Sequence, residues 1–205
     1  MKIKSFEKKD KLIKAALDEF TQKSYDEASL NNIIKNAGIS KGSFYYHFKN
    51  KKDLYTYIYL EVANAKMSFF NKELKNYVEE MKDKNIFEVL KLYGRLGFKF
   101  AREYPIYYQL AKRLFEEKNK ELMAHIRNQF THFSDNIVDN LIERAIERKE
   151  IRDDFSIDFT INLIKHLFLN YDKVVLKDIN EAEIDELIKL YDNYLDFIQN
   201  GLGKK

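Results

Sequence analysis

Residues 12–54, LIKAALDEFTQKSYDEASLNNIIKNAGISKGSFYYHFKNKKDL, decide the fold. Apolar residues recur at helical spacing from Leu12 to Phe20, with Lys and Asp between them. This spacing predicts an amphipathic first helix that begins near Ser5 or Phe6.

Two short helices are expected directly after the first. Ser29 is placed to cap the second helix, which should end at Gly38, a good residue for a helix C-terminus. Ser40 is placed to cap a very short third helix whose inward residues would be Phe44 and Phe48. Only Gly-Ile-Ser separates the two helices, and this spacing is typical of a helix-turn-helix.

Long helices are expected in the rest of the chain. A fourth helix should start around Asn50 and run on without a linker, and Pro105 fits a helix start, where its missing N–H costs nothing. Breaks are expected at Asp153-Asp154 and Lys177-Asp178. Five further helices are predicted at about 85–102, 106–117, 119–149, 156–177 and 181–200. The prediction is an all-α protein of about nine helices, in which an N-terminal three-helix helix-turn-helix domain (1–53) is joined by a long helix to a C-terminal helical ligand-binding and dimerisation domain (54–205).

Composition supports this fold and excludes several classes of protein. The 205 residues include 6 Gly, 1 Pro and no Cys, so strand and turn signals are scarce and disulfides are impossible. We find neither an apolar run of membrane-spanning length nor the apolar core of a signal peptide, and we expect a cytoplasmic protein without a membrane segment. Residues 1–54 hold 12 Lys and 7 acidic residues, which suggests a polyanion-binding end.

The spacing of four elements within residues 12–54 resembles the TetR family of transcriptional regulators. These are Ala15-Ala16, Ala37-Gly38-Ile39-Ser40, Tyr45-Tyr46-His47-Phe48 and Lys51, with no gaps between them. The resemblance covers about a quarter of the chain. It implies a repressor that binds double-stranded, palindromic operator DNA as a homodimer through its last two long helices. It also implies a small-molecule effector, which we expect to be mostly apolar, in the C-terminal domain.

The recognition segment supplies most of the expected DNA contacts. Lys41 and Ser43 are best placed to reach base edges, and Gly42 would let the helix approach the duplex closely. By resemblance, Tyr45, His47 and Lys51 would contact the DNA backbone. The serines could instead be plain caps, and one of the adjacent tyrosines could be a core residue. The full predicted set is Ser29, Asn31, Ser40, Lys41, Gly42, Ser43, Tyr45, Tyr46, His47 and Lys51.

Three departures from the family pattern affect the prediction. Ser24 stands where the family usually has Gly, and Asn32 stands where many members have an acidic residue that completes a capping box. No Arg occurs before Arg95, so the basic half lacks the commonest guanine-reading side chain. We therefore expect an operator that leans toward A·T, read more through its backbone than through its bases.

The C-terminal domain offers aromatic candidates for an effector pocket. A polar tip on an apolar wall suits a mostly apolar ligand, although an aromatic stripe at helical spacing also fits ordinary core packing. His125 and His132, with Glu121 nearby, lie too far apart on one helix to share a metal without a third element. The ligand-binding candidates are Phe69, Phe70, Leu96, Phe100, Tyr107, Tyr108, Phe130, Phe133 and His166.

The alternatives to an effector-controlled regulator are a regulator that binds a protein partner and an enzyme. The C-terminal body could bind a protein partner in place of a small molecule, and a filled core would favour that alternative. Catalysis is not expected, because we find no Cys, only dispersed His, and no Gly-rich phosphate loop. We expect no catalytic residue, no metal site and no cofactor.

Overall fold

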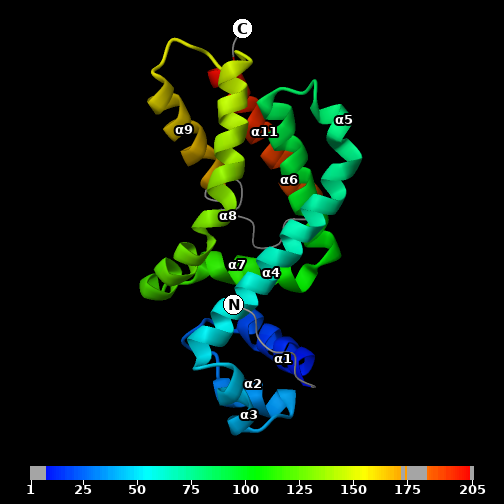
Figure 1. The fold of residues 1–205 in the computed structure, drawn as a ribbon, viewed down its shortest axis with the longest axis vertical. Coiled ribbons are helices and arrows are strands. Elements are labelled where there is room, and N and C mark those ends of the chain that lie inside the picture. Colours follow the sequence, from blue (N-terminus) through cyan, green and yellow to red (C-terminus); the bar gives the residue numbers. More distant parts are fainter. Residues whose placement is uncertain (1–7, 172–173, 175–183, 204–205) are drawn as a thin grey trace. The chain divides into compact units, whose positions relative to one another are not determined.

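The computed structural model describes residues 8–171, 174 and 184–203, and these residues form helices without a strand (Figure 1). The all-α prediction is confirmed. An antiparallel bridge joins Ile151 to Gly203. In the described part of the chain, no helix is long and apolar enough to cross a membrane. The helices are α1 (Lys9–Gln22), α2 (Leu30–Ala37), α3 (Lys41–His47), α4 (Lys51–Leu74), η1 (Lys75–Tyr77), α5 (Val78–Met81), α6 (Ile86–Glu103), α7 (Pro105–Glu116), α8 (Lys120–Glu147), α9 (Ile157–Leu169) and α11 (Ile184–Leu202).

The chain divides into two compact units. Unit 1 combines residues 1–69 with 103–130, and unit 2 combines residues 70–102 with 131–205. Helix α7 and the start of α8 thus pack with the N-terminal helices. The domain boundary expected after residue 53, where the helix-turn-helix ends, stays a prediction.

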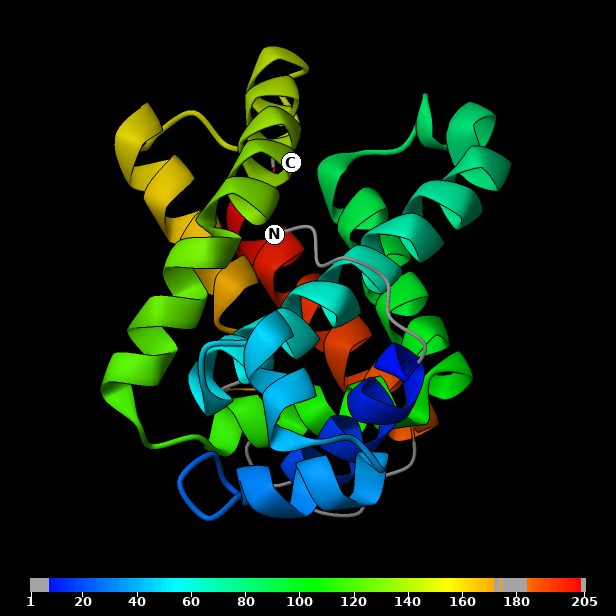
Figure 2. The same cartoon turned by 60° about the horizontal axis from the view of Figure 1, so that its bottom comes forward.

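The N-terminal helices of unit 1 form the expected helix-turn-helix around the start of α4 (Figure 2). Leu12 and Phe20 of α1, Ile33 of α2 and Phe44 of α3 are all fully buried in one apolar cluster. Burial of such side chains contributes about 1.5–3 kcal/mol each, so this cluster holds three short helices that would not be stable alone.

Helix α1 begins later than expected. It starts at Lys9, because Lys8 has non-helical backbone angles (φ −111°, ψ 15°), while Ser5 and Phe6 lie outside the described residues. The Lys8 ammonium donates to the carbonyl of Gly38 at 2.8 Å. The residue before α1 therefore supports the turn between α2 and α3.

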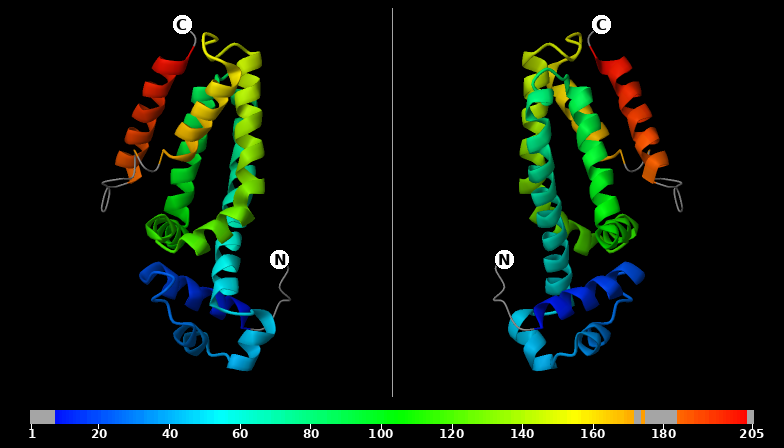
Figure 3. Two further views of the ribbon diagram at one scale, coloured as in Figure 1. Left: turned by 90° about the vertical axis from the view of Figure 1, so that its left-hand side faces the viewer. Right: turned by 90° about the vertical axis from the view of Figure 1, so that its right-hand side faces the viewer.

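Unit 2 is built from α6, the later part of α8, α9 and α11, which lie alongside one another in Figure 3. Gly94 of α6 lies directly against Tyr191 of α11: a Cβ at Gly94 would come within 2.0 Å of the Tyr191 ring. Tyr191 is buried and donates its hydroxyl to the carbonyl of Leu90 at 3.2 Å. Close packing of α6 on α11 therefore depends on the absence of a side chain at Gly94.

One helix boundary in the second half of the chain differs from the prediction. Helix α9 ends at Leu169 rather than near residue 177, because the side-chain amide of Asn170 donates to the His166 carbonyl at 2.8 Å and satisfies an end carbonyl of the helix. The stretch 75–81, before the helix predicted at about 85–102, forms η1 and α5. The break expected at Lys177-Asp178 lies outside the described residues.

Candidate nucleic-acid interface

The N-terminus of α2 is capped from two directions. The Ser29 hydroxyl accepts a hydrogen bond from the backbone N–H of Asn32, as the sequence predicts. In a capping box the backbone N–H of the cap residue would be bound by an acid at the position of Asn32. Here the carboxylate of Glu19 in α1 accepts the Ser29 N–H instead, at 2.9 Å. The missing acid is thus supplied by another helix, and Glu19 is not among the residues that the sequence pattern predicts for this site.

The Glu19 carboxylate is buried and ionised. Burial by itself would raise its pKa, but hydrogen bonds from the Lys23 ammonium (2.7 Å) and from the Ser29 N–H hold the pKa below its usual value. Removing either donor would leave a buried charge that is poorly compensated. Glu19 therefore fixes the position of α2 relative to α1.

Ser24 forms a turn that needs no glycine. The preceding residue, Lys23, has an extended backbone (φ −130°, ψ 151°), and Ser24 does not have a positive φ. The Ser24 hydroxyl donates to the Glu27 carboxylate at 2.6 Å, and the Ser24 carbonyl accepts from the Ala28 N–H at 3.0 Å. The departure from the family pattern at Ser24 therefore changes the chemistry of the turn without straining it.

Lys51, at the start of α4, binds the loop between α1 and α2. Its ammonium donates to the carbonyls of Tyr25 at 2.5 Å, Ala28 at 2.8 Å and Asp26 at 3.4 Å. It also lies 4.4 Å from the centroid of the Tyr25 ring, and burial lowers its pKa. All three ammonium hydrogens have an acceptor within the protein. The phosphate contact expected of Lys51 stays a prediction, and this geometry favours a positioning role.

The turn and the cap of α3 match the sequence prediction. Gly38 has left-handed backbone angles (φ 63°, ψ 36°), and the Ser40 hydroxyl accepts from the Ser43 N–H at 3.1 Å. Phe44 and Phe48 are buried and stack with their ring centroids 5.6 Å apart. Because these two rings anchor one face of α3, the opposite face is left to solvent.

The exposed face of α3 is polar and aromatic. Tyr45 and Tyr46 are 57% and 76% exposed, so neither is a core residue. Lys41 and Gly42 are exposed as well, and a Cβ at Gly42 would meet nothing closer than the Ser40 Oγ at 3.9 Å. No contact within the described residues therefore explains why this helix carries a glycine.

The structure brings most of the predicted DNA-binding residues onto two neighbouring helices, α2 and α3. Asn31 and Ser40 are exposed, whereas Ser29, Ser43, His47 and Lys51 are half-buried. The Tyr46 and His47 rings meet edge to face with centroids 4.9 Å apart. Contact of each of these residues with DNA remains a prediction.

Two polar residues, one from α7 and one from the α7–α8 corner, hold the loop after α1. The Arg113 guanidinium donates to the carbonyls of Thr21 at 2.9 Å and Gln22 at 3.1 Å, the last two residues of α1. The Glu117 carboxylate accepts the Tyr25 N–H at 3.0 Å. These contacts join residues more than ninety positions apart, and no local sequence pattern could have indicated them.

The predicted effector residues are spread over both units. Phe69, Leu96 and Phe100 are buried, which fits core packing as well as a ligand wall. Phe70, Tyr107 and Tyr108 are half-buried, and His166 is exposed. The side chains of Phe130 and Phe133 lie outside the described residues. Unit 2 has a pocket between the end of α4, α5, the start of α6 and the last turns of α8, and none of these candidates lines it.

No cluster of three or more metal-binding side chains occurs among the residues that the structure describes. His125 is half-buried on α8, and the side chain of His132 lies outside the described residues.

Comparisons with known proteins point to one family. Residues 12–58 match the model of the bacterial regulatory proteins of the tetR family. The negative transcriptional regulator IcaR of the biofilm operon icaADBC from Staphylococcus epidermidis is 30% identical over 135 residues, which span 63% of this chain and 67% of IcaR. The transcriptional regulator QacR from Staphylococcus aureus is 26% identical over 96% of this chain and 98% of QacR.

Solved structures share the fold over nearly the whole length. A TetR family transcriptional regulator from Chloroflexus aurantiacus superposes with a TM-score of 0.64 at 24% identity, covering 97% of this chain and 94% of that one. The regulator FadR from Bacillus subtilis, solved in complex with stearoyl-CoA, superposes with a TM-score of 0.63 at 20% identity, covering 94% of this chain and 98% of FadR.

Proposed function

The chain belongs to the TetR family of bacterial regulatory proteins, and on that premise we propose that it is a transcriptional repressor whose α3 enters the major groove of operator DNA. The exposed glycine of α3 carries this proposal. Gly42 lies in the first turn of α3, where glycine is less favourable than alanine by at most the roughly 0.5–1 kcal/mol of a helix interior. A duplex that must approach the helix backbone closely accounts for that cost.

The other exposed groups of α3 fit the same role. Lys41 and Ser43 are on the first turn, from which side chains reach base edges in a helix-turn-helix complex. Tyr45 and Tyr46 carry hydroxyl groups suited to phosphate contacts, which position a protein on DNA without reading sequence. Asn31 on α2 has the amide geometry that pairs with adenine.

A homodimer would present two such helices to a palindromic operator. Apolar side chains are exposed on the last two helices: Ile157 and Phe159 of α9 are 60% and 50% exposed, and Leu190 and Phe197 of α11 are 39% and 79% exposed. A two-fold interface through α9 and α11 would remove this surface from water. Two-fold symmetry in the protein requires two-fold symmetry in the DNA site.

An effector is proposed to control binding in the cytoplasm, where the DNA lies. The solved FadR complex supports a small-molecule effector for this fold, and the name of IcaR as a negative regulator supports repression. The effector must bind the DNA-competent and DNA-incompetent states with different affinities, because an equal affinity would shift nothing.

The substitution Gly42→Ala tests this function by separating folding from DNA binding. Its free energy of unfolding should rise by up to about 1 kcal/mol, because a Cβ at this position meets only the Ser40 Oγ, at an ordinary contact distance of 3.9 Å. Its affinity for an operator selected from random duplexes should nevertheless fall, measured by fluorescence anisotropy. Gly201→Ala is the matched control, since a Cβ at that helical position meets nothing within 4 Å. If Gly42→Ala binds the operator as tightly as the wild type, α3 does not approach DNA closely and the proposal is wrong.

A further inference from the structure

Unit 2 contains a pocket of about 320 Å³ where the end of α4, α5, the start of α6 and the last turns of α8 meet. Its apolar floor includes Leu74, Met81, Val89 and Leu141. The volume lies at the lower end of the range of about 300–1,000 Å³ that is common for small-molecule sites. It has room for on the order of ten non-hydrogen atoms, if each takes roughly the 30 Å³ of a liquid water molecule.

Four cationic side chains and one acid complete the lining of this pocket. Arg148 donates to the carbonyls of Lys82 at 2.7 Å and Lys84 at 3.2 Å, and it pairs with Glu150 at 3.3 Å. The other carboxylate oxygen of Glu150 accepts the Ile86 N–H at 2.6 Å. Arg148 and Glu150 are therefore committed to holding the end of α8 against the start of α6.

The two lysines of the lining are also paired. Lys82 pairs with Glu79 at 2.6 Å, and Lys84 lies 3.2 Å from Glu80 and 3.7 Å from Glu88. Together with Glu150, these acids lie within ion-pair distance of three of the four cations of the lining, and among the described residues only Arg144 of these four has no ion-pair partner.

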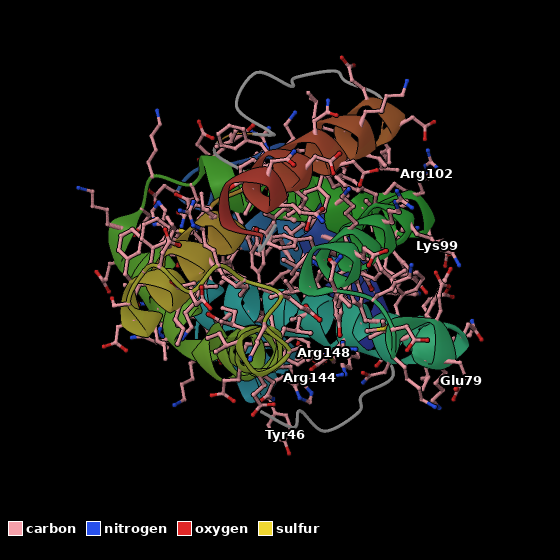
Figure 4. All side chains as sticks on the ribbon, turned by 90° about the horizontal axis from the view of Figure 1, so that it is seen from above. Tyr46, Glu79, Lys99, Arg102, Arg144 and Arg148 are labelled. Atoms are coloured by element: carbon pink, nitrogen blue, oxygen red, sulfur yellow. The ribbon has the colours of Figure 1, made fainter. Side chains whose placement is uncertain are left out.

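Arg144 is the cationic side chain of the pocket lining that forms no ion pair with any of the described residues. It lies on the last turn of α8, four residues before Arg148, and Figure 4 shows the two side chains close together. Arg144 is exposed, and the ion pairs and hydrogen bonds of the described residues do not include it. Its guanidinium is free to bind a carboxylate through two parallel hydrogen bonds.

We propose that this pocket binds a small organic anion, an apolar chain of about eight carbons that ends in a carboxylate. The carboxylate binds Arg144, and the chain lies on the apolar floor between α4, α6 and α8. Such a ligand links the end of α4 to α8, and α4 is the helix that begins at the helix-turn-helix. The proposal rests on the proposed function only where the anion is taken as the effector, because binding itself can be measured without DNA.

Isothermal titration calorimetry of the full chain with octanoate tests the pocket. Octanol has the same chain length without the charge, and it should bind at least about tenfold more weakly, since hydrogen bonds to charged groups are among the strongest in proteins. Octylammonium should bind no better than octanol, because its charge would meet the guanidinium of Arg144, which has the same sign.

The variant Arg144→Gln identifies the site. It should weaken octanoate binding at least about tenfold and leave octanol binding unchanged. Arg95→Gln is the matched control, because Arg95 is an exposed arginine of the same unit that lies outside the pocket. Circular dichroism should show that both variants keep the helix content of the wild type.

Three results would overturn the proposal: no octanoate binding at millimolar concentration, equal binding of octanol and octanoate, or unchanged octanoate affinity in Arg144→Gln. Operator binding is titrated on the same preparations without ligand. If the wild-type protein fails to bind the operator in this titration, that result counts against the proposed function. The calorimetric result on the pocket would still stand.

Discussion

Replacing Lys51 by Met should destabilise the protein more than it weakens the charge-dependent part of DNA binding. The substitution keeps an apolar stem and removes the ammonium, which donates at 2.5 Å and 2.8 Å to the carbonyls of Tyr25 and Ala28. A hydrogen bond to a charged group contributes about 1.5–3 kcal/mol, and half-burial places each of these two near the lower end. We expect the free energy of unfolding to fall by about 2–3 kcal/mol.

Two assays measure the effect. Urea unfolding followed by circular dichroism gives the free energy of unfolding. Titration of operator DNA at several salt concentrations gives the slope of log K against log[salt], which changes by about 0.9 for each phosphate contact. Lys49→Met is the matched control, because Lys49 is exposed and only its backbone N–H makes a hydrogen bond in the described structure. The control should change stability by less than about 0.5 kcal/mol.

The salt slope distinguishes the two roles of Lys51. If Lys51 positions the loop, Lys51→Met loses stability and keeps the salt slope of the wild type. If Lys51 contacts a phosphate in each protomer of a dimer, the slope falls by about 1.8. An unchanged free energy of unfolding together with that lower slope would refute the positioning role.

Three further predictions concern the packing, the cap and the dimer. Gly94→Ala should destabilise unit 2 by about 1–3 kcal/mol in thermal unfolding, because its Cβ overlaps the Tyr191 ring. Gly97→Ala is the control and should not destabilise it, because the nearest atom to a Cβ at Gly97 lies at 4.0 Å. Equal melting points of the two variants would contradict this packing. Glu19 has a lowered pKa in the folded state, so the stability it contributes is present above its ordinary value of 4.5 and is lost as the pH falls through the folded value. Urea unfolding across this pH window should show a weaker pH dependence for Glu19→Gln, and an identical profile would exclude this role. Phe197→Glu should leave the helix content intact and shift sedimentation toward a monomer; an unchanged dimer would exclude Phe197 from the interface.

Local chemistry explains why the helix-turn-helix could be predicted from the sequence. Ser29 and Ser40 cap helices through hydrogen bonds to residues three positions ahead, and Gly38 alone can adopt the left-handed turn without strain. Such contacts depend on neighbours in the sequence. The short third helix and its buried face at Phe44 follow from the same local pattern.

Three residues could not be assigned a role from the sequence, because their roles depend on contacts with residues far away in the chain. The sequence pattern does not distinguish Glu19 from the other charged residues of its amphipathic helix. Only the packing of α1 on α2 shows that its carboxylate binds the Ser29 N–H. In the sequence, Arg113 has the pattern of an exposed charged residue of α7. In the structure, its guanidinium binds the end of α1. Arg144 stands in an ordinary polar stretch, and its place at a pocket depends on three other segments of the chain.

Selection of operator sequences from random double-stranded DNA, followed by titration of the selected site, tests the central claim most directly. We predict a palindromic site whose half-sites are spaced by about one helical turn, roughly 34 Å, and whose binding is weakened by Lys41→Ala on α3. Lys72→Ala, an exposed lysine of unit 2, should leave the affinity unchanged. Enrichment of no sequence, or equal loss of affinity in both variants, would contradict the assignment of α3 as the helix that reads DNA.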